Sequence, residues 1–151
     1  MLDDDVREIV ASARLAFVAT TDPYGAPHVS PKGSLAVHDD RHLVFMDIDS
    51  PGTVANLAAD PRVSINVIDF LRRRGYGFSG TARFLGAGDP TYESLRAGLL
   101  ERNGPDFPAH RAVLVEVTAV REIRSPAYTF GGAREDELAA SWTTRYSPPP
   151  D

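Results

Sequence analysis

Short apolar segments alternate with polar turns through the first 85 residues, and this pattern predicts antiparallel strands. The segments are rich in Val, Ile, Phe and Leu, whereas Asp, Pro and Gly concentrate in the turns. The predicted strands are residues 15–20, 27–37, 42–47, 62–68 and 77–85, with a short helix at 53–59. Because short turns join most of these strands, the predicted fold class is mainly β. We expect an antiparallel Greek-key barrel with a few helices rather than a doubly wound parallel sheet.

The remaining sequence predicts three helices and one more strand. The helices are expected at 3–12, 89–102 and 134–143, and the strand at 112–117. The second helix begins with Asp-Pro, which suits an N-cap followed by the first helical position. We expect a single domain over residues 1–146 and a disordered tail over 147–151.

Composition and charge exclude several classes of protein. Of the 151 residues, 42% are apolar and 25% charged, which is typical of a globular domain. The net charge of −5 argues against a general nucleic-acid binder, and the absence of cysteine excludes disulfides, thiolate metal sites and cysteine nucleophiles. No apolar run approaches the ~20 residues that cross a bilayer. The N-terminus is acidic, unlike a secretory signal, so we expect a cytoplasmic location.

The segment Ser30-Pro31-Lys32-Gly33 places polar groups inside an otherwise apolar strand pair. A lysine here would face an anion, with the Ser30 hydroxyl as a hydrogen-bond donor beside it. The alternative is a strand-edge turn, in which Pro and Gly break the hydrogen-bond ladder and Lys32 points to water. Both interpretations stay open from these residues alone.

A helix start follows at Ser50 and Pro51, which suit the N-cap and the first turn. Exposed amides at a helix N-terminus attract phosphate or carboxylate, and Thr53 and Asn56 would share one helical face. Most capped helices bind nothing, so this feature alone does not predict a ligand.

Three adjacent arginines, Arg72, Arg73 and Arg74, form a positive patch in an acidic protein. The simplest interpretation is a solvated hairpin tip. The alternative is contact with an anion, including one bound in the site of a neighbouring subunit, with the ring of Tyr76 packed against a flat ligand.

The C-terminal region offers Tyr128 and the pair Trp142 and Arg145. These side chains would close over a ligand or dock onto an open end of the barrel, and docking is the favoured interpretation for Trp142.

Other chemistry is not indicated. The four histidines lack the spacing of a zinc site, so no metal is expected. No Ser-His-Asp order with a nucleophile elbow and no glycine-rich phosphate loop is present.

Taken in order, these segments resemble the pyridoxamine 5'-phosphate oxidase-like family of FMN-binding split barrels. The resemblance rests on Val29-Ser-Pro-Lys-Gly, Leu43-Val-Phe-Met-Asp and Gly80-Thr-Ala-Arg-Phe-Leu, together with the stretches 15–27 and 50–65. It is good over about residues 6–85 and loose beyond them.

The resemblance implies a homodimer with two FMN sites at its interface, each built from both chains. It places Ser30, Lys32 and Gly33 on the phosphate and ribityl side, and Asp47, Ser50 and Thr53 on the other side. Arg74 and Tyr76 would approach from the partner or the adjacent hairpin. Tyr128 completes the predicted cofactor-binding residues as an aromatic side chain that closes over the ligand.

One departure from the family pattern concerns charge. Many members carry an Arg-Lys pair at the start of the short helix, where this chain has Pro51-Gly52-Thr53-Val54. Lys32 and one of the three adjacent arginines would replace that charge.

The resemblance predicts an FMN-dependent oxidoreductase that acts on a small organic molecule. Pyridoxine-phosphate oxidation itself is not expected, because only Trp142 and Arg145 loosely match the substrate-phosphate residues. The alternatives are a deazaflavin (F420)-dependent reductase on the same barrel, a non-catalytic protein that binds flavin or haem, and a scaffold without a cofactor.

Overall fold

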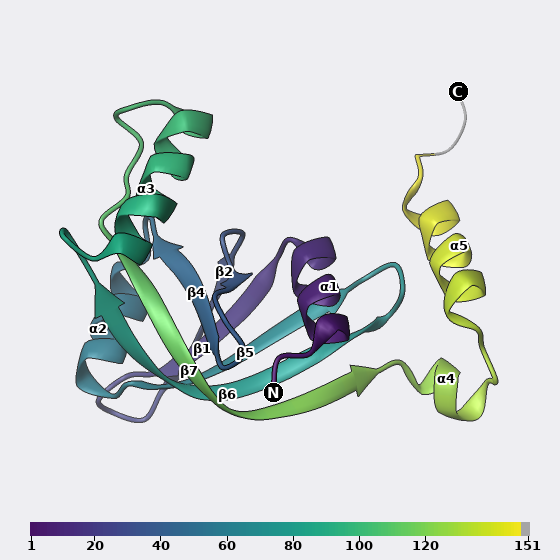
Figure 1. Ribbon diagram of the computed structural model, residues 1–151. Coiled ribbons are helices and arrows are strands. Elements are labelled where there is room, and N and C mark those ends of the chain that lie inside the picture. The colour runs from purple at the N-terminus through teal and green to yellow at the C-terminus, as the bar shows by residue number, and fades with distance from the viewer. Residues whose placement is uncertain (149–151) are drawn as a thin grey trace.

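The computed structural model describes residues 1–148 and consists of one curled antiparallel sheet, with one helix inside the curl and the other helices at its ends (Figure 1). The predicted mainly-β split-barrel fold is confirmed. The strands are β1 (Ala16–Thr21), β2 (Pro27–Lys32), β3 (Ala36–Val37), β4 (His42–Asp47), β5 (Arg62–Asp69), β6 (Arg74–Leu85) and β7 (Arg111–Arg124). The helices are α1 (Asp4–Ala13), α2 (Pro51–Ala59), α3 (Pro90–Asn103), α4 (Pro126–Phe130) and α5 (Glu135–Tyr146). Within these residues, no helix has both the length and the apolar character that a membrane crossing requires.

The strand order, β2-β1-β5-β6-β7-β4-β3, brings distant segments together. Strand β7 pairs with β6 on one side and with β4 on the other, so that Val113 lies opposite both Phe84 and Phe45. Near the β3 end of the sheet, the amide of Met46 on β4 donates a hydrogen bond to Ser34 Oγ at 3.0 Å. This bond links the turn after β2 to β4 and positions the polar end of β2 near β4.

The hydrophobic core lies on the concave side of the sheet, under α1. Val6 and Ile9 of α1 pack with Phe45 and Phe78 in one buried cluster. A second cluster lies under α3 and includes Val44, on the opposite face of β4. Because both faces of β4 are covered, its apolar residues form a continuous run rather than a strict alternation.

The structure differs from the predicted elements at four places. Residues 27–37 form two strands, because the chain turns between β2 and β3. Strand β6 begins at Arg74 rather than residue 77, and β7 continues to Arg124 rather than 117. Side chains near these extensions are largely polar, so the apolar pattern does not reveal them. The short helix α4 was not predicted.

The C-terminal elements form an arm beyond the end of β7 (Figure 1). We define the arm as α4 and α5, residues 126–146. Residues 149–151 of the expected disordered tail lie outside the described residues, and the single domain over 1–146 stays a prediction.

A close backbone approach at Gly75 yields a stability prediction. A Cβ atom added there would lie 1.9 Å from the backbone oxygen of Val67 on β5. We expect Gly75→Ala to lower the free energy of unfolding by about 2 kcal/mol or more, because β5 and β6 must separate to admit the methyl group.

The matched control is Gly86→Ala, where an added Cβ meets no atom within 4 Å. Its effect on chemical denaturation should stay within about 0.5 kcal/mol. Equal stability of the two variants would show that β5 and β6 do not approach as closely as described.

Candidate functional site

Asp47, the last residue of β4, lies at the centre of a buried polar cluster. The residue is only 5% exposed, and its carboxylate accepts a hydrogen bond from Ser50 Oγ at 2.9 Å. Arg111 lies directly opposite Asp47 in the β4–β7 ladder, with its Nε 3.4 Å from the carboxylate. The amide of His110 donates to the Asp47 carbonyl at 3.1 Å. Asp47 therefore joins the end of β4 to the starts of α2 and β7.

Lys32 is the chain's only lysine, and it lies at the inner end of β2 with 8% of its surface exposed. Its Nζ donates to Ser30 Oγ at 2.6 Å and lies 6.0 Å from the centre of the Phe45 ring. Burial lowers the pKa of Lys32, while the nearby charge of Asp47 opposes that shift. An ammonium group has three donors, and Ser30 supplies only a neutral acceptor. Lys32 is thus a desolvated cation with capacity for an anion.

The start of α2 provides further donors. Ser50 occupies the N-cap position as predicted, but its hydroxyl bonds to Asp47 and makes no capping bond to the helix. The first-turn amides therefore lack a Ser50 side-chain cap. A cavity of about 410 Å³ borders this helix start and is lined by Asp47, Ser50, His110 and Arg111, among others.

The sequence-predicted residues do not all lie together in the structure. Ser30, Lys32, Asp47 and Ser50 are linked by hydrogen bonds and by the charge of Asp47, and buried Thr53 lies in the adjacent first turn of α2. Gly33 follows Lys32 and lines a different cleft, next to α1. We refer to Ser30, Lys32, Asp47, Ser50 and Arg111 as the Asp47 cluster.

Sequence reasoning missed Arg111. An arginine immediately before an apolar strand looks like any strand boundary, and only the β4–β7 pairing places it against Asp47. It also missed the buried hydrogen bond from Asn56 Nδ2 to Thr20 Oγ1 at 3.0 Å, which fixes α2 against β1.

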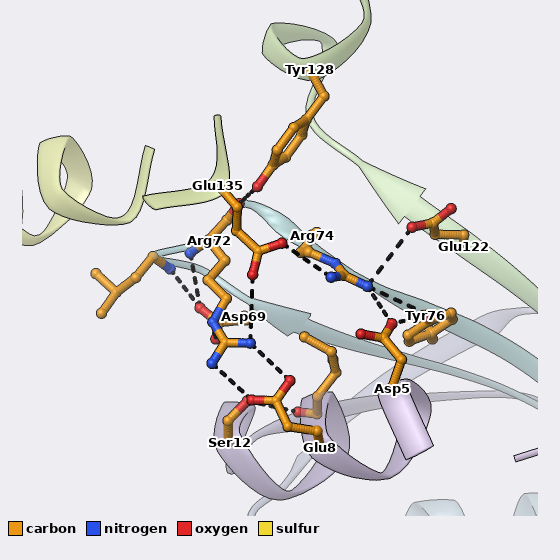
Figure 2. A network of polar contacts seen from close by, with 12 residues as sticks. Asp5, Glu8, Ser12, Asp69, Arg72, Arg74, Tyr76, Glu122, Tyr128 and Glu135 are labelled. Carbon is orange, nitrogen blue, oxygen red and sulfur yellow. Dashed lines mark hydrogen bonds and ion pairs between the residues drawn. The ribbon is translucent and has the colours of Figure 1, made fainter. Parts of the chain in front are cut away.

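The other predicted residues, Arg74, Tyr76 and Tyr128, belong to a separate ion-pair network (Figure 2). Arg74 is buried and pairs with Asp5 of α1, Glu135 of α5 and Glu122 of β7. The Tyr76 hydroxyl donates to Asp5. The Tyr128 hydroxyl donates to the Arg72 carbonyl at 2.5 Å.

The neighbouring arginines also have partners. Arg72 pairs with Glu8 at 2.8 Å and with Asp69 at 3.3 Å. Arg73 lies over the Trp142 ring at 4.2 Å, in line with the predicted docking role of Trp142. The interpretation of this run as a solvated hairpin tip is therefore wrong for Arg74, whose guanidinium is buried among carboxylates. Within one chain, the arginine beside Asp47 is Arg111, and none of the three adjacent arginines lies there.

The network yields a prediction for alkaline pH. Burial and the hydrogen bond to Asp5 raise the pKa of Tyr76 to about 12. A raised folded-state pKa contributes stability that is complete below the ordinary value of about 10 and is lost as pH rises toward 12. We expect the free energy of unfolding to fall less steeply between pH 10 and 12 in Tyr76→Phe than in the unmodified chain.

Tyr24→Phe is the matched control, because Tyr24 is 96% exposed and its hydroxyl makes no hydrogen bond within residues 1–148. Urea denaturation of the three proteins across this range measures the slopes. Identical slopes for Tyr76→Phe and the unmodified chain would contradict the proposed link between Tyr76 and stability.

Comparison with known proteins places this architecture in a family. The family model described as pyridoxamine 5'-phosphate oxidase matches residues 2–124. A search of curated proteins finds no match.

Solved structures agree in fold at low sequence identity. HupZ of Group A Streptococcus is 24% identical, with a TM-score of 0.73 over 83% of this chain and 96% of that chain. An F420 reductase is 21% identical, with a TM-score of 0.62 over 79% and 98%. An FMN-binding protein of Syntrophomonas wolfei is 14% identical, with a TM-score of 0.59 over 80% and 90%. On the strength of the family match, the chain belongs to the pyridoxamine 5'-phosphate oxidase family.

Proposed function

We propose that the chain is an FMN-dependent oxidoreductase that works as a homodimer on a small organic molecule. The observation that carries this proposal is the Asp47 cluster beside the start of α2, in which Arg111 lies 3.4 Å from a buried carboxylate and buried Lys32 lies within range of its charge. Family membership supports the choice of FMN.

The donors and acceptors of the cluster suit the two polar parts of FMN. The phosphate accepts hydrogen bonds, and Lys32 has donors that Ser30 does not use. Within residues 1–148, Nε of Arg111 is buried without a hydrogen-bond partner. The first-turn amides of α2 add donors suited to an anion. Ribityl hydroxyls instead need acceptors, which Asp47 and Ser30 provide.

The chain's own groups then have distinct tasks. Lys32, Arg111 and the α2 amides bind the phosphate, and Asp47 orients both cations while accepting from a hydroxyl. Bound FMN supplies hydride or electron transfer through its isoalloxazine ring. Accordingly, no side chain is assigned as a catalytic acid or base.

The outer face of the sheet supports the homodimer. It exposes Phe17 (44%) and Val29 (64%) on β1 and β2, beside small residues of the next strands. Ser64 of β5 pairs with Ser79 of β6, which pairs with Ala119 of β7. A shallow hollow of about 590 Å³ runs over this face. Small side chains around a few apolar ones allow a second sheet to approach closely.

A dimer also bears on the three predicted residues of the ion-pair network. Within one chain, Arg74, Tyr76 and Tyr128 bond to groups of α1, the β5–β6 hairpin and the arm. These residues can therefore contact only a cofactor that is bound in the site of the other subunit.

A deazaflavin reductase is the second candidate, supported by the structural match to an F420 reductase. F420 has a long acidic tail that a basic groove would accommodate. The charges of Arg72 and Arg74 are already balanced by carboxylates of α1, α5, β5 and β7. FMN is therefore favoured.

The first test is the visible spectrum of the purified protein, followed by titration with FMN. We expect flavin absorption bands or saturable quenching of FMN fluorescence. Bands at shorter wavelength would identify a deazaflavin, and a Soret band would identify haem. A colourless protein that does not bind added FMN would contradict the proposal.

Lys32→Met should weaken FMN binding by about 10- to 150-fold, since a charge-assisted hydrogen bond contributes about 1.5–3 kcal/mol. The free energy of unfolding should not fall by a comparable amount, because the substitution also removes a desolvated charge. Arg96→Met, on the exposed surface of α3, is the control and should change affinity less than twofold. Unchanged FMN affinity in Lys32→Met would remove this residue from the site.

The dimer is tested by placing a charge on the outer face. Ser79→Arg should convert the dimer to a monomer in analytical ultracentrifugation and weaken FMN binding with it, because both depend on one interface. Ser94→Arg, at an exposed position of α3, is the same substitution elsewhere and should leave a dimer. A dimer that persists in Ser79→Arg would place the interface on another surface.

A further inference from the structure

A cleft of about 560 Å³ lies between α1, the turn that joins β2 to β3, and the C-terminal end of α3. Three arginines line it: Arg7 and Arg14 from α1 and its C-terminal end, and Arg102 from α3. Its apolar lining includes Val10, Leu35 and Val37, which belong to or pack against the main core. The cleft thus combines an aliphatic floor with guanidinium groups.

The charge of this cleft is not balanced by its own lining. Among the described residues, no side chain that lines it carries a carboxylate, although the chain as a whole has a net charge of −5. Arg14 and Arg102 make no ion pair or side-chain hydrogen bond within residues 1–148. Arg7 pairs at 2.7 Å with Asp40, an exposed carboxylate outside the lining, and its Nε donates to the Leu2 carbonyl at 3.1 Å.

Helix dipoles explain these arginines only in part. Arg14 caps the C-terminal end of α1, and Arg102 lies in the last turn of α3, where a cation is stabilising. This accounts for the position of each residue along its own helix. The helix dipole does not explain why Arg14 and Arg102 line the same apolar cleft. Nor does it explain Arg7, which lies in the first half of α1 and lines that cleft too.

We propose that this cleft binds a small organic anion with a carboxylate or phosphate group attached to a short apolar body. The arginines would bind the anionic group in paired hydrogen bonds, which the guanidinium fork favours. The apolar body would lie over Val10, Leu35 and Val37, away from water.

The cleft is separate from the Asp47 cluster, although the two adjoin along the chain. Gly33 lines the cleft and directly follows Lys32. The proposal does not depend on FMN, because it rests on residues of α1 and its C-cap, α3, β3 and the β2–β3 turn.

The test is isothermal titration calorimetry of the full chain, without added flavin, using octanoate, octyl phosphate and octanol as probes. We expect one equivalent of either anion to bind per chain, with octanol at least tenfold weaker. The tighter of the two anions identifies the preferred anionic group. The double variant Arg14→Gln with Arg102→Gln should lose at least tenfold in affinity for both anions.

Two controls make the result decisive. Arg83→Gln with Arg96→Gln removes two exposed arginines outside the cleft and should change affinity less than twofold. Lys32→Met should also have little effect. Equal binding of octanol, unchanged affinity in the Arg14 and Arg102 variant, or loss of binding in Lys32→Met alone would each overturn the proposal. The FMN titration is a separate measurement, so either hypothesis can fail without the other.

Discussion

The buried carboxylate of Asp47 is the constraint on which the candidate site depends. Lys32 and Arg111 come from opposite sides of the curled sheet. Lys32 is buried, so its charge carries a desolvation penalty, whereas the Arg111 side chain is 42% exposed and keeps contact with water. The nearby charge of the Asp47 carboxylate offsets part of the penalty on Lys32, because attraction strengthens where water is excluded. The hydrogen bond from the Ser50 hydroxyl connects the start of α2 to the same carboxylate. The contacts of Asp47 therefore fix β4, β7 and α2 relative to one another, and the cluster leaves donors for a further anion.

The second ion-pair network has a different role, because its cations are already surrounded by carboxylates. Arg74 connects α1, β7 and α5 through Asp5, Glu122 and Glu135. Arg73 and Phe70 of the β5–β6 hairpin contact Trp142 and Tyr146 of the arm. These contacts hold the arm beside the hairpin, although none of its residues is buried in the core. Basic residues in this chain are thus divided between a network that fixes structure and groups with unused donors.

The sequence predicted the elements whose burial is regular. Strand β5 alternates between buried and exposed residues, and β4 is a continuous apolar run, so both were found close to their observed bounds. Lys32 was found because it is polar within an apolar region. The partner of Asp47 was not found, because Arg111 is 64 positions away and only strand register brings them together. For Arg74 the sequence offered a solvated hairpin tip or a contact with the cofactor. Its carboxylate partners were not found, because they come from α1, β7 and α5, which local pattern cannot combine.

The central claim is that Asp47 balances the charges of Lys32 and Arg111, and a double-mutant cycle on the protein without FMN tests it most directly. We expect Asp47→Asn to lower the free energy of unfolding by about 1–3 kcal/mol, because it leaves two cations poorly compensated. In a Lys32→Met background the same substitution should cost less than half as much, since one of those cations is gone. An equal cost in both backgrounds would show that the two residues act independently and would contradict the account.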